Sequence, residues 1–200
     1  MPGTPTTPHP DVHALDELHV TLRACTGCGL ATTRTQVVVG DGDPSARLMV
    51  VGEAPGAEED RTGRPFVGRS GQLLERLLAS ELGLSRDECF IANVVKCRPP
   101  DNRNPTPAEV AACRPHLTRQ VELVRPAVVL TLGNFASRLL LDTREGITRL
   151  RGRVYPGAPG APVVVPTLHP AAVLRGGSAR LADVRADLAL VSAALEESAA

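Results

Sequence analysis

Four short apolar runs alternate with stretches of helical periodicity, and this alternation constrains the fold more than any other feature of the chain. The runs occupy residues 48–51, 90–92, 128–132 and 163–165. Neighbouring parallel strands need a long crossover connection, which is usually a helix. The alternation therefore predicts an α/β fold, in which a parallel sheet carries helices on both faces.

Capping residues mark where the helices should begin and end. Asp11 can cap a first helix, and Gly83 stands where a helix commonly ends in a left-handed glycine. Residues 106–109 form a capping box with proline at the first helical position, and Ser178 precedes the last periodic segment. Pro115 lies inside one helical pattern, so we expect a kink or an interruption there.

The length of 200 residues suits one domain with a full apolar core. We expect residues 1–10, which are rich in proline and threonine, to be a disordered tail, and residues 11–200 to form a single domain. No apolar run approaches the roughly 18 residues of a membrane span, and no signal peptide is recognisable. These features favour a cytoplasmic protein that does not enter a membrane, and we expect a monomer.

Charge does not by itself indicate a nucleic-acid partner, because 22 basic residues balance 22 acidic ones. An argument for DNA must therefore rest on local patches. The segment around Lys96, Arg98 and Arg103 is basic and stiffened by prolines, which suits phosphate contacts, although a solvated loop would look the same. Arg175 and the pair Arg151 and Arg153 extend this basic set.

Five cysteines in a reducing compartment favour metal binding or burial over disulfides. Cys25 and Cys28 form a C-x2-C pair, and Cys97 and Cys113 follow far downstream. Four thiolates suit either tetrahedral zinc or an iron–sulfur cluster, and the wide second spacing is more typical of a cluster. Four unrelated buried cysteines remain an alternative. Cys89 lies beside a strand and is expected in the core.

The loops at 52–68, 93–105 and 167–175 each follow a strand, so they should converge at the carboxyl edge of the sheet. Phe66 lies in a glycine- and proline-rich loop, where a base can stack on it. Asn93 offers a donor and an acceptor that match a nucleobase edge. His169 ends the fourth strand, and Glu53 follows the first. We expect Glu58 and Asp60 to be solvated.

Five ordered motifs together resemble the family 4 uracil-DNA glycosylases, the iron–sulfur branch of the uracil-DNA glycosylase superfamily. They are GEAPG at 52–56, GRPFVG at 63–68, GQLL at 71–74, NVVKCRPP at 93–100 and HPAAVLR at 169–175. The resemblance extends from about Cys25 to Arg175. It implies a three-layer α/β/α fold with a four-stranded parallel sheet, and an enzyme that flips uracil from single- or double-stranded DNA and hydrolyses its N-glycosidic bond, leaving an abasic site.

The resemblance also implies roles for particular residues. A 4Fe–4S cluster would be held by Cys25, Cys28, Cys97 and Cys113. Phe66 would stack on the base, Asn93 would read it and His169 would bond its O2. Water would be oriented or activated by Glu53 and Glu59, and the turn with Gly52 and Ala54 would contact the substrate. DNA would be contacted by Lys96, Arg98, Arg103 and Arg175.

Two other classes of function compete with this interpretation. A related branch traps uracil-DNA covalently through a histidine-bearing loop, but the corresponding stretch at 149–155 has no histidine. The second class is an electron-transfer iron–sulfur protein. It would leave Phe66, Asn93 and His169 without a function, so it is the least favoured. One departure concerns family 1 enzymes, which carry Asp and Tyr where this chain has Ala54 and Gly56, so the exclusion of thymine cannot use that tyrosine.

Overall fold

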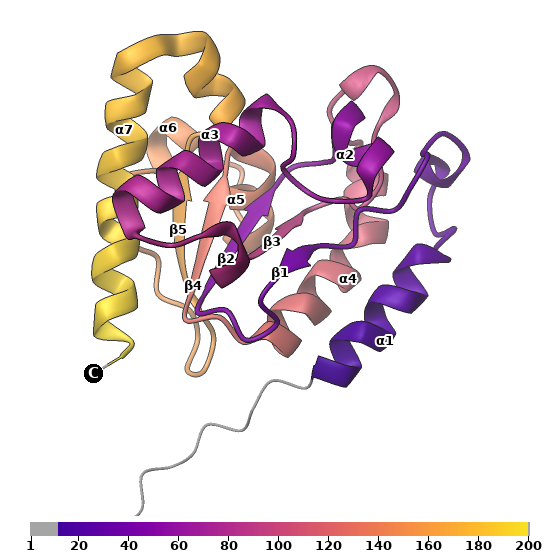
Figure 1. Ribbon diagram of the computed structural model, residues 1–200, viewed down its shortest axis with the longest axis horizontal. Coiled ribbons are helices and arrows are strands. Elements are labelled where there is room, and N and C mark those ends of the chain that lie inside the picture. Colours follow the sequence, from indigo (N-terminus) through magenta and orange to yellow (C-terminus); the bar gives the residue numbers. More distant parts are fainter. Residues whose placement is uncertain (1–11, 200) are drawn as a thin grey trace, which may run out of the picture.

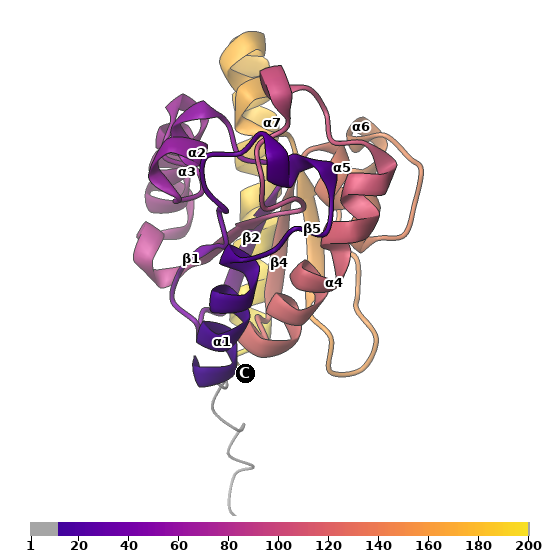
Figure 2. The ribbon, with the colours of Figure 1, turned by 90° about the vertical axis from the view of Figure 1, so that its right-hand side faces the viewer.

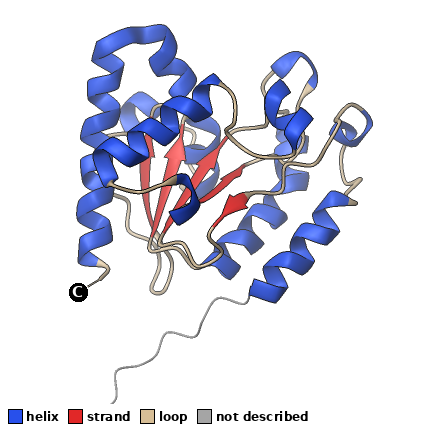
Figure 3. Ribbon diagram, in the orientation of Figure 1, coloured by secondary structure: helices blue, strands red, loops and turns tan. Residues whose placement is uncertain are grey.

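A five-stranded, mostly parallel sheet forms the centre of the molecule in the computed structural model, which describes residues 12–199 (Figures 1 and 3). The sheet order is β1-β3-β2-β4-β5. The four long strands are parallel, as the sequence predicts. Their bounds are β2 (Leu48–Gly52), β3 (Phe90–Asn93), β4 (Val128–Leu132) and β5 (Val163–Thr167). The predicted tail at 1–10 and the Asp11 cap lie outside the described residues.

Both edges of the sheet carry short extra pairings that the sequence analysis did not predict. The two-residue strand β1 (Asp41–Gly42) pairs antiparallel with β3. A Cβ on Gly42 would lie 1.8 Å from the carbonyl oxygen of Cys89, so only glycine fits there. At the opposite edge, Tyr155 exchanges two backbone hydrogen bonds with Val164 of β5, at 2.9 and 2.8 Å.

Helices cover both faces of the sheet, which gives the three-layer arrangement (Figures 1 and 2). Alternate residues of β2 enter different cores, with Val50 on one side and Met49 on the other. The Val50 side is covered by α3 (Arg69–Leu77), α6 (Ile147–Leu150) and α7 (Pro170–Glu197), and the Met49 side by α1 (Val12–Arg23), α4 (Pro107–Val124) and α5 (Asn134–Leu140).

The remaining helical segments are short. They are α2 (Ala57–Thr62), which follows β2, and η1 (Gly29–Thr32), η2 (Leu78–Leu82), η3 (Arg86–Glu88) and η4 (Pro100–Asn102). No helix among residues 12–199 combines the length and the apolar character that crossing a membrane requires.

The helix ends test the capping signals directly. The capping box is confirmed, because the Thr106 hydroxyl accepts from the Glu109 N–H and the Glu109 carboxylate accepts from the Thr106 N–H. Gly83 ends its helix with φ 66°, as predicted. We expected a kink or an interruption at Pro115; an interruption is wrong, since α4 runs through this residue. Pro115 and Ala111 are both exposed, so water can bond the carbonyl that the proline leaves unpaired.

The last helix begins earlier than its sequence signal suggests. We expected a start at Ser178, whereas α7 starts at Pro170 with His169 as its N-cap. Gly177 has non-helical dihedrals, with φ 69° and ψ −155°. A break in α7 therefore lies directly before Ser178, where we expected the helix to begin. The first turns of α7 therefore carry His169 and Arg175 on one rigid segment at the carboxyl edge of the sheet.

Candidate functional site

A cleft of about 940 Å³ opens at the carboxyl edge of the sheet. Its lining combines Glu53, Ala54 and Gly56 after β2 with Pro99 and Arg103 from the loop after β3. The β4–α5 and β5–α7 junctions complete it with Gly133, Asn134, His169 and Arg175. The prediction that the loops after the strands converge is confirmed.

Because Gly52 has no side chain, two side chains that we predicted to contact substrate, Phe66 and Asn93, can pack against the end of β2. A Cβ at this position would lie 2.4 Å from Cζ of Phe66 and 2.5 Å from Oδ1 of Asn93. Both side chains therefore reach the bare Cα of Gly52, which any other residue would cover. The Phe66 ring also faces His169, with ring centroids 5.9 Å apart. The structure thus brings Gly52, Phe66, Asn93 and His169 together.

Phe66 is held in an uncommon backbone conformation. Its φ is 52°, a left-handed value that costs a non-glycine residue about 1–2 kcal/mol. Arg86 donates hydrogen bonds to the carbonyl oxygens of Pro65 and Phe66. A Cβ on Gly71 would lie 1.8 Å from the Phe66 carbonyl oxygen, so α3 can approach only because residue 71 is glycine. These contacts fix the ring before any ligand arrives.

Asn93 ends β3 with its amide buried, at 1% exposure. Its Oδ1 is the one buried side-chain polar atom among residues 12–199 that has no hydrogen-bond partner. Leaving such an atom unpaired costs about 1–3 kcal/mol, and few native groups are left so. An unpaired acceptor beside an aromatic ring is the feature expected where a ligand donor completes the site.

His169 presents one ring nitrogen to the protein and leaves the other free to donate. Its Nδ1 accepts a hydrogen bond from the Ala171 N–H at 3.1 Å, which places the proton on Nε2. Burial lowers the pKa of His169 to about 4, helped by the charge of Arg175. The ring is therefore neutral at pH 7. A Cβ on Gly133, whose φ is 84°, would lie 3.2 Å from the His169 Cβ, so glycine at this position leaves room for the histidine.

The two candidate carboxylates have different surroundings. Glu53 lines the cleft, is half-buried, and has its pKa raised by burial. Glu59 does not line the cleft; its carboxylate accepts from the N–H groups of Gly56, Val67 and Gly68 at 2.9–3.0 Å. Glu59 thus ties the turn after β2 to the Phe66 loop. The Gly56 N–H, already bonded, is not available to a ligand.

Cys25, Cys28, Cys97 and Cys113 line a single cavity, although they come from three separate segments. Arg34 donates to the Sγ of Cys97 at 3.4 Å, and His116 lies 3.8 Å from the Sγ of Cys25. Burial raises the pKa of Cys97 to about 11, so a positive group is needed to hold its thiolate. Within residues 12–199, no three His, Cys, Asp or Glu side chains are grouped to hold one metal ion.

The donor set fits a polynuclear cluster, because four thiols from separated segments surround one space. Cys89 lies elsewhere, fully buried in the other core, as expected.

Lys96 is buried, although the sequence predicts a contact with DNA. The side chain is 1% exposed, and its ammonium donates to the Asn93 carbonyl oxygen at 2.8 Å and to Gln120 Oε1 at 2.5 Å. A contact between Lys96 and DNA is therefore wrong. The surrounding loop looks solvated in sequence, but α4 places Gln120 over it from 24 residues away.

The other predicted DNA contacts remain near the surface. Arg175 is exposed and lines the cleft, and Arg103 lines it while paired with Glu109 at 2.7 Å. Arg98 donates to Asn102. Arg151 lines the cleft too, but ion pairs with buried Asp187 and with Asp183 hold it.

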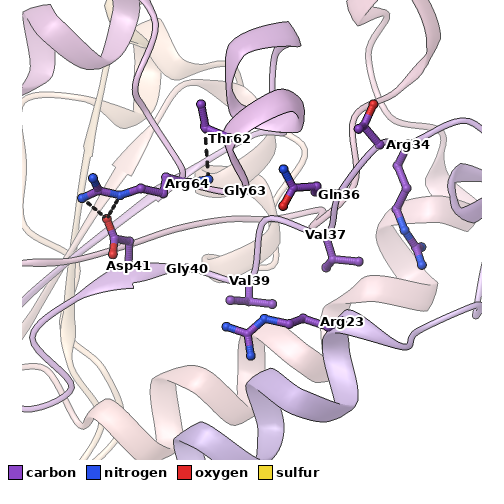
Figure 4. Close-up of a pocket in the computed structure, with 11 residues that line it drawn as sticks. Arg23, Arg34, Gln36, Val37, Val39, Gly40, Asp41, Thr62, Gly63 and Arg64 are labelled. Atoms are coloured by element: carbon purple, nitrogen blue, oxygen red, sulfur yellow. Dashed lines mark hydrogen bonds and ion pairs between the residues drawn. The ribbon is translucent and has the colours of Figure 1, made fainter.

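Some relevant residues were missed or misjudged. Asp60, expected to be solvated, is buried and accepts from the N–H groups of Thr35 and Gln36. A second hollow of about 530 Å³ gathers Arg23, Arg34 and Arg64, with Arg64 directed at Asp41 (Figure 4). Their separation in sequence hides this grouping.

Comparisons with known proteins agree with this geometry. The profile of the uracil DNA glycosylase superfamily matches residues 39–190. A type-4 uracil-DNA glycosylase from Thermotoga maritima is 48% identical over 161 residues, 80% of this chain and 83% of that protein. One from Saccharolobus solfataricus is 45% identical over 166 residues, 80% and 77% of the two chains.

A type-5 uracil-DNA glycosylase from Pyrobaculum aerophilum is 44% identical over 115 residues, half of each chain. The type-4 relatives thus share far more of the chain's length. The chain therefore belongs to the uracil DNA glycosylase superfamily, and within it to the type-4 uracil-DNA glycosylases.

Proposed function

We propose that this protein removes uracil from DNA by hydrolysing the N-glycosidic bond of a flipped nucleotide, the first step of base excision repair. The main support is the buried Oδ1 of Asn93, which has no hydrogen-bond partner among residues 12–199 and lies beside Phe66 and Gly52. Uracil offers an N3–H donor to this oxygen, and its O4 can accept from the same amide. Because a base inside a duplex cannot reach this pocket, the nucleotide must leave the stack.

The chemistry follows from charge that develops as the bond breaks. The sugar becomes cationic and the uracil anionic, and the neutral His169 ring can donate from Nε2 to the base. A preorganised donor of this kind contributes about 3–4 kcal/mol. Glu53 is the carboxylate suited to orient water and to favour the cation, since it lines the cleft with no hydrogen bond to its carboxylate among the described residues. Glu59 acts by positioning the loops.

We propose that a 4Fe–4S cluster is held by the four cysteines that line one cavity, Cys25, Cys28, Cys97 and Cys113. Its support is the donor set, together with the likeness to type-4 enzymes. When bound, the cluster supplies structural bonds that join the segments of Cys25, Cys97 and Cys113. The test is iron and sulfide analysis of anaerobically purified protein, where one zinc and no iron would refute the assignment.

Uracil-containing DNA is the proposed partner, and we expect a cytoplasmic monomer. Arg175, Arg103 and Arg98 supply positive charge near the cleft, so affinity should decline with salt. Leu174, next to Arg175, is among the exposed large apolar side chains, at 43%. An apolar side chain at this place can fill the gap that a flipped base leaves in the stack.

The decisive assay measures release of free uracil from labelled single-stranded and duplex oligonucleotides. Release with an alkali-sensitive abasic site supports the proposal. A protein–DNA adduct without free uracil would indicate trapping instead, and no reaction with a fully iron-loaded protein would refute a glycosylase.

A further inference from the structure

Lys96 is the only lysine of the chain, and its side chain lies between the two proposed sites. The residue lines the cavity of the four cysteines and directly precedes Cys97. The Lys96 ammonium donates to the carbonyl oxygen of Asn93, whose side-chain oxygen lies beside Gly52. One side chain thus contacts both the cluster site and the residue proposed to read uracil.

The immediate surroundings of this cation are neutral. Its two hydrogen-bond acceptors are the Asn93 carbonyl and the Gln120 amide oxygen. Among residues 12–199, no carboxylate forms an ion pair with it. A buried charge without an opposite charge costs several kcal/mol. A nearby anion would remove most of that cost, and the cysteine cavity is where the chain has gathered groups able to carry negative charge.

The amine is also held firmly in place. Gln120 is fully buried, donates from Nε2 to the Val39 carbonyl at 2.6 Å and lies 3.3 Å from the His19 ring. Residues between Asn93 and Lys96 are buried as well. A shift of the ammonium would therefore pull on the end of β3 rather than be absorbed by solvent.

We propose that Lys96 is the internal counter-cation of the cysteine-bound cluster and, through its bond to the Asn93 carbonyl, a positioning residue for uracil recognition. The inference rests on the proposed cluster and the proposed glycosylase activity. Four thiolates give a 4Fe–4S group a net negative charge, which a fixed buried cation stabilises most in its reduced, more negative state. The strand end that carries Asn93 is then tied to the cluster site by a charge-assisted hydrogen bond.

The test compares Lys96→Met, which keeps an unbranched side chain, with Arg114→Met, which removes an equal charge beside Cys113 on the exposed face of α4. In Lys96→Met, the cluster reduction potential should fall and chelator-induced iron loss should accelerate about tenfold or more. Selectivity for uracil over cytosine should drop about tenfold, as expected for one lost charge-assisted bond. Arg114→Met should change none of these, since solvent screens its charge.

The outcomes separate this inference from the function on which it rests. Wild-type protein that releases uracil but contains no iron would overturn the inference and leave the activity standing. Iron-loaded Lys96→Met with an unchanged potential would overturn the inference alone. Should Lys96→Met not fold, ¹⁵N-lysine labelling of the wild type gives one side-chain signal. We expect this signal to be that of an ammonium, and its relaxation to change when the cluster is reduced. A signal of a neutral amine, or a relaxation rate that does not change on reduction, would overturn the inference.

Discussion

Replacing His169 separates its two bonds, one to the protein and one to the leaving base. In His169→Ala, the donor at Nε2 disappears, which should raise the barrier by about 3–4 kcal/mol and slow excision about 100- to 1000-fold. The bond from the Ala171 N–H is lost as well, and an N-cap contributes about 1 kcal/mol to stability. His169→Asn keeps a good N-cap acceptor but is too short to place a donor where Nε2 lies.

We therefore expect equally slow excision in His169→Ala and His169→Asn, but a loss of thermal stability mainly in His169→Ala. Single-turnover excision and equilibrium binding to uracil-DNA measure the two effects separately. Binding should change little, because the histidine bond strengthens as charge appears on the base. Since the pKa of His169 is about 4, its contribution to the rate should stay constant between pH 8 and pH 5.5. A loss of binding in proportion to rate would show that the ring merely supports the pocket.

Three further predictions follow from the same geometry. Asn93→Asp should weaken uracil excision and shift preference towards cytosine, measured as the ratio of single-turnover rates on the two bases, because a carboxyl group presents a different hydrogen-bond pattern. Gly52→Ala should reduce excision at least about 100-fold with folding retained by circular dichroism, since its Cβ would displace the Phe66 ring and the Asn93 amide; near-normal rates would contradict the pocket. Burial lowers the pKa of His19 to about 4, so stability should be full above pH 6.5 and fall towards pH 4; His19→Gln should make the unfolding midpoint less sensitive between pH 7 and pH 5.

The predictable part of the molecule is the part governed by local signals. Strands of continuous apolar residues and the capping box at Thr106 need no knowledge of their neighbours, and both are confirmed. The grouping of Phe66, Asn93 and His169 could also be predicted, because each lies in or at the start of a loop that follows a strand, and parallel strands bring their carboxyl ends to one edge of the sheet.

The errors arose where a distant element decides the environment. Lys96 looks solvated among its prolines, but Gln120 of α4 buries it. Asp60 looks like one acid among several, yet the Thr35 and Gln36 N–H groups enclose it. β1 has two residues and no apolar pattern, and it exists only because Gly42 fits against Cys89. None of these partners stands close in the sequence.

The pairings at the sheet margins bear on how the protein behaves in a concentrated solution. A bare outer strand offers unpaired N–H and C=O groups to which another chain can add a strand, a common beginning of aggregation. Here β1 occupies that position beside β3, and Tyr155 occupies it beside β5. Because no side chain larger than hydrogen fits at residue 42, a substitution of Gly42 would free the margin of β3. Its first consequence would be self-association of folded molecules through this edge of the sheet.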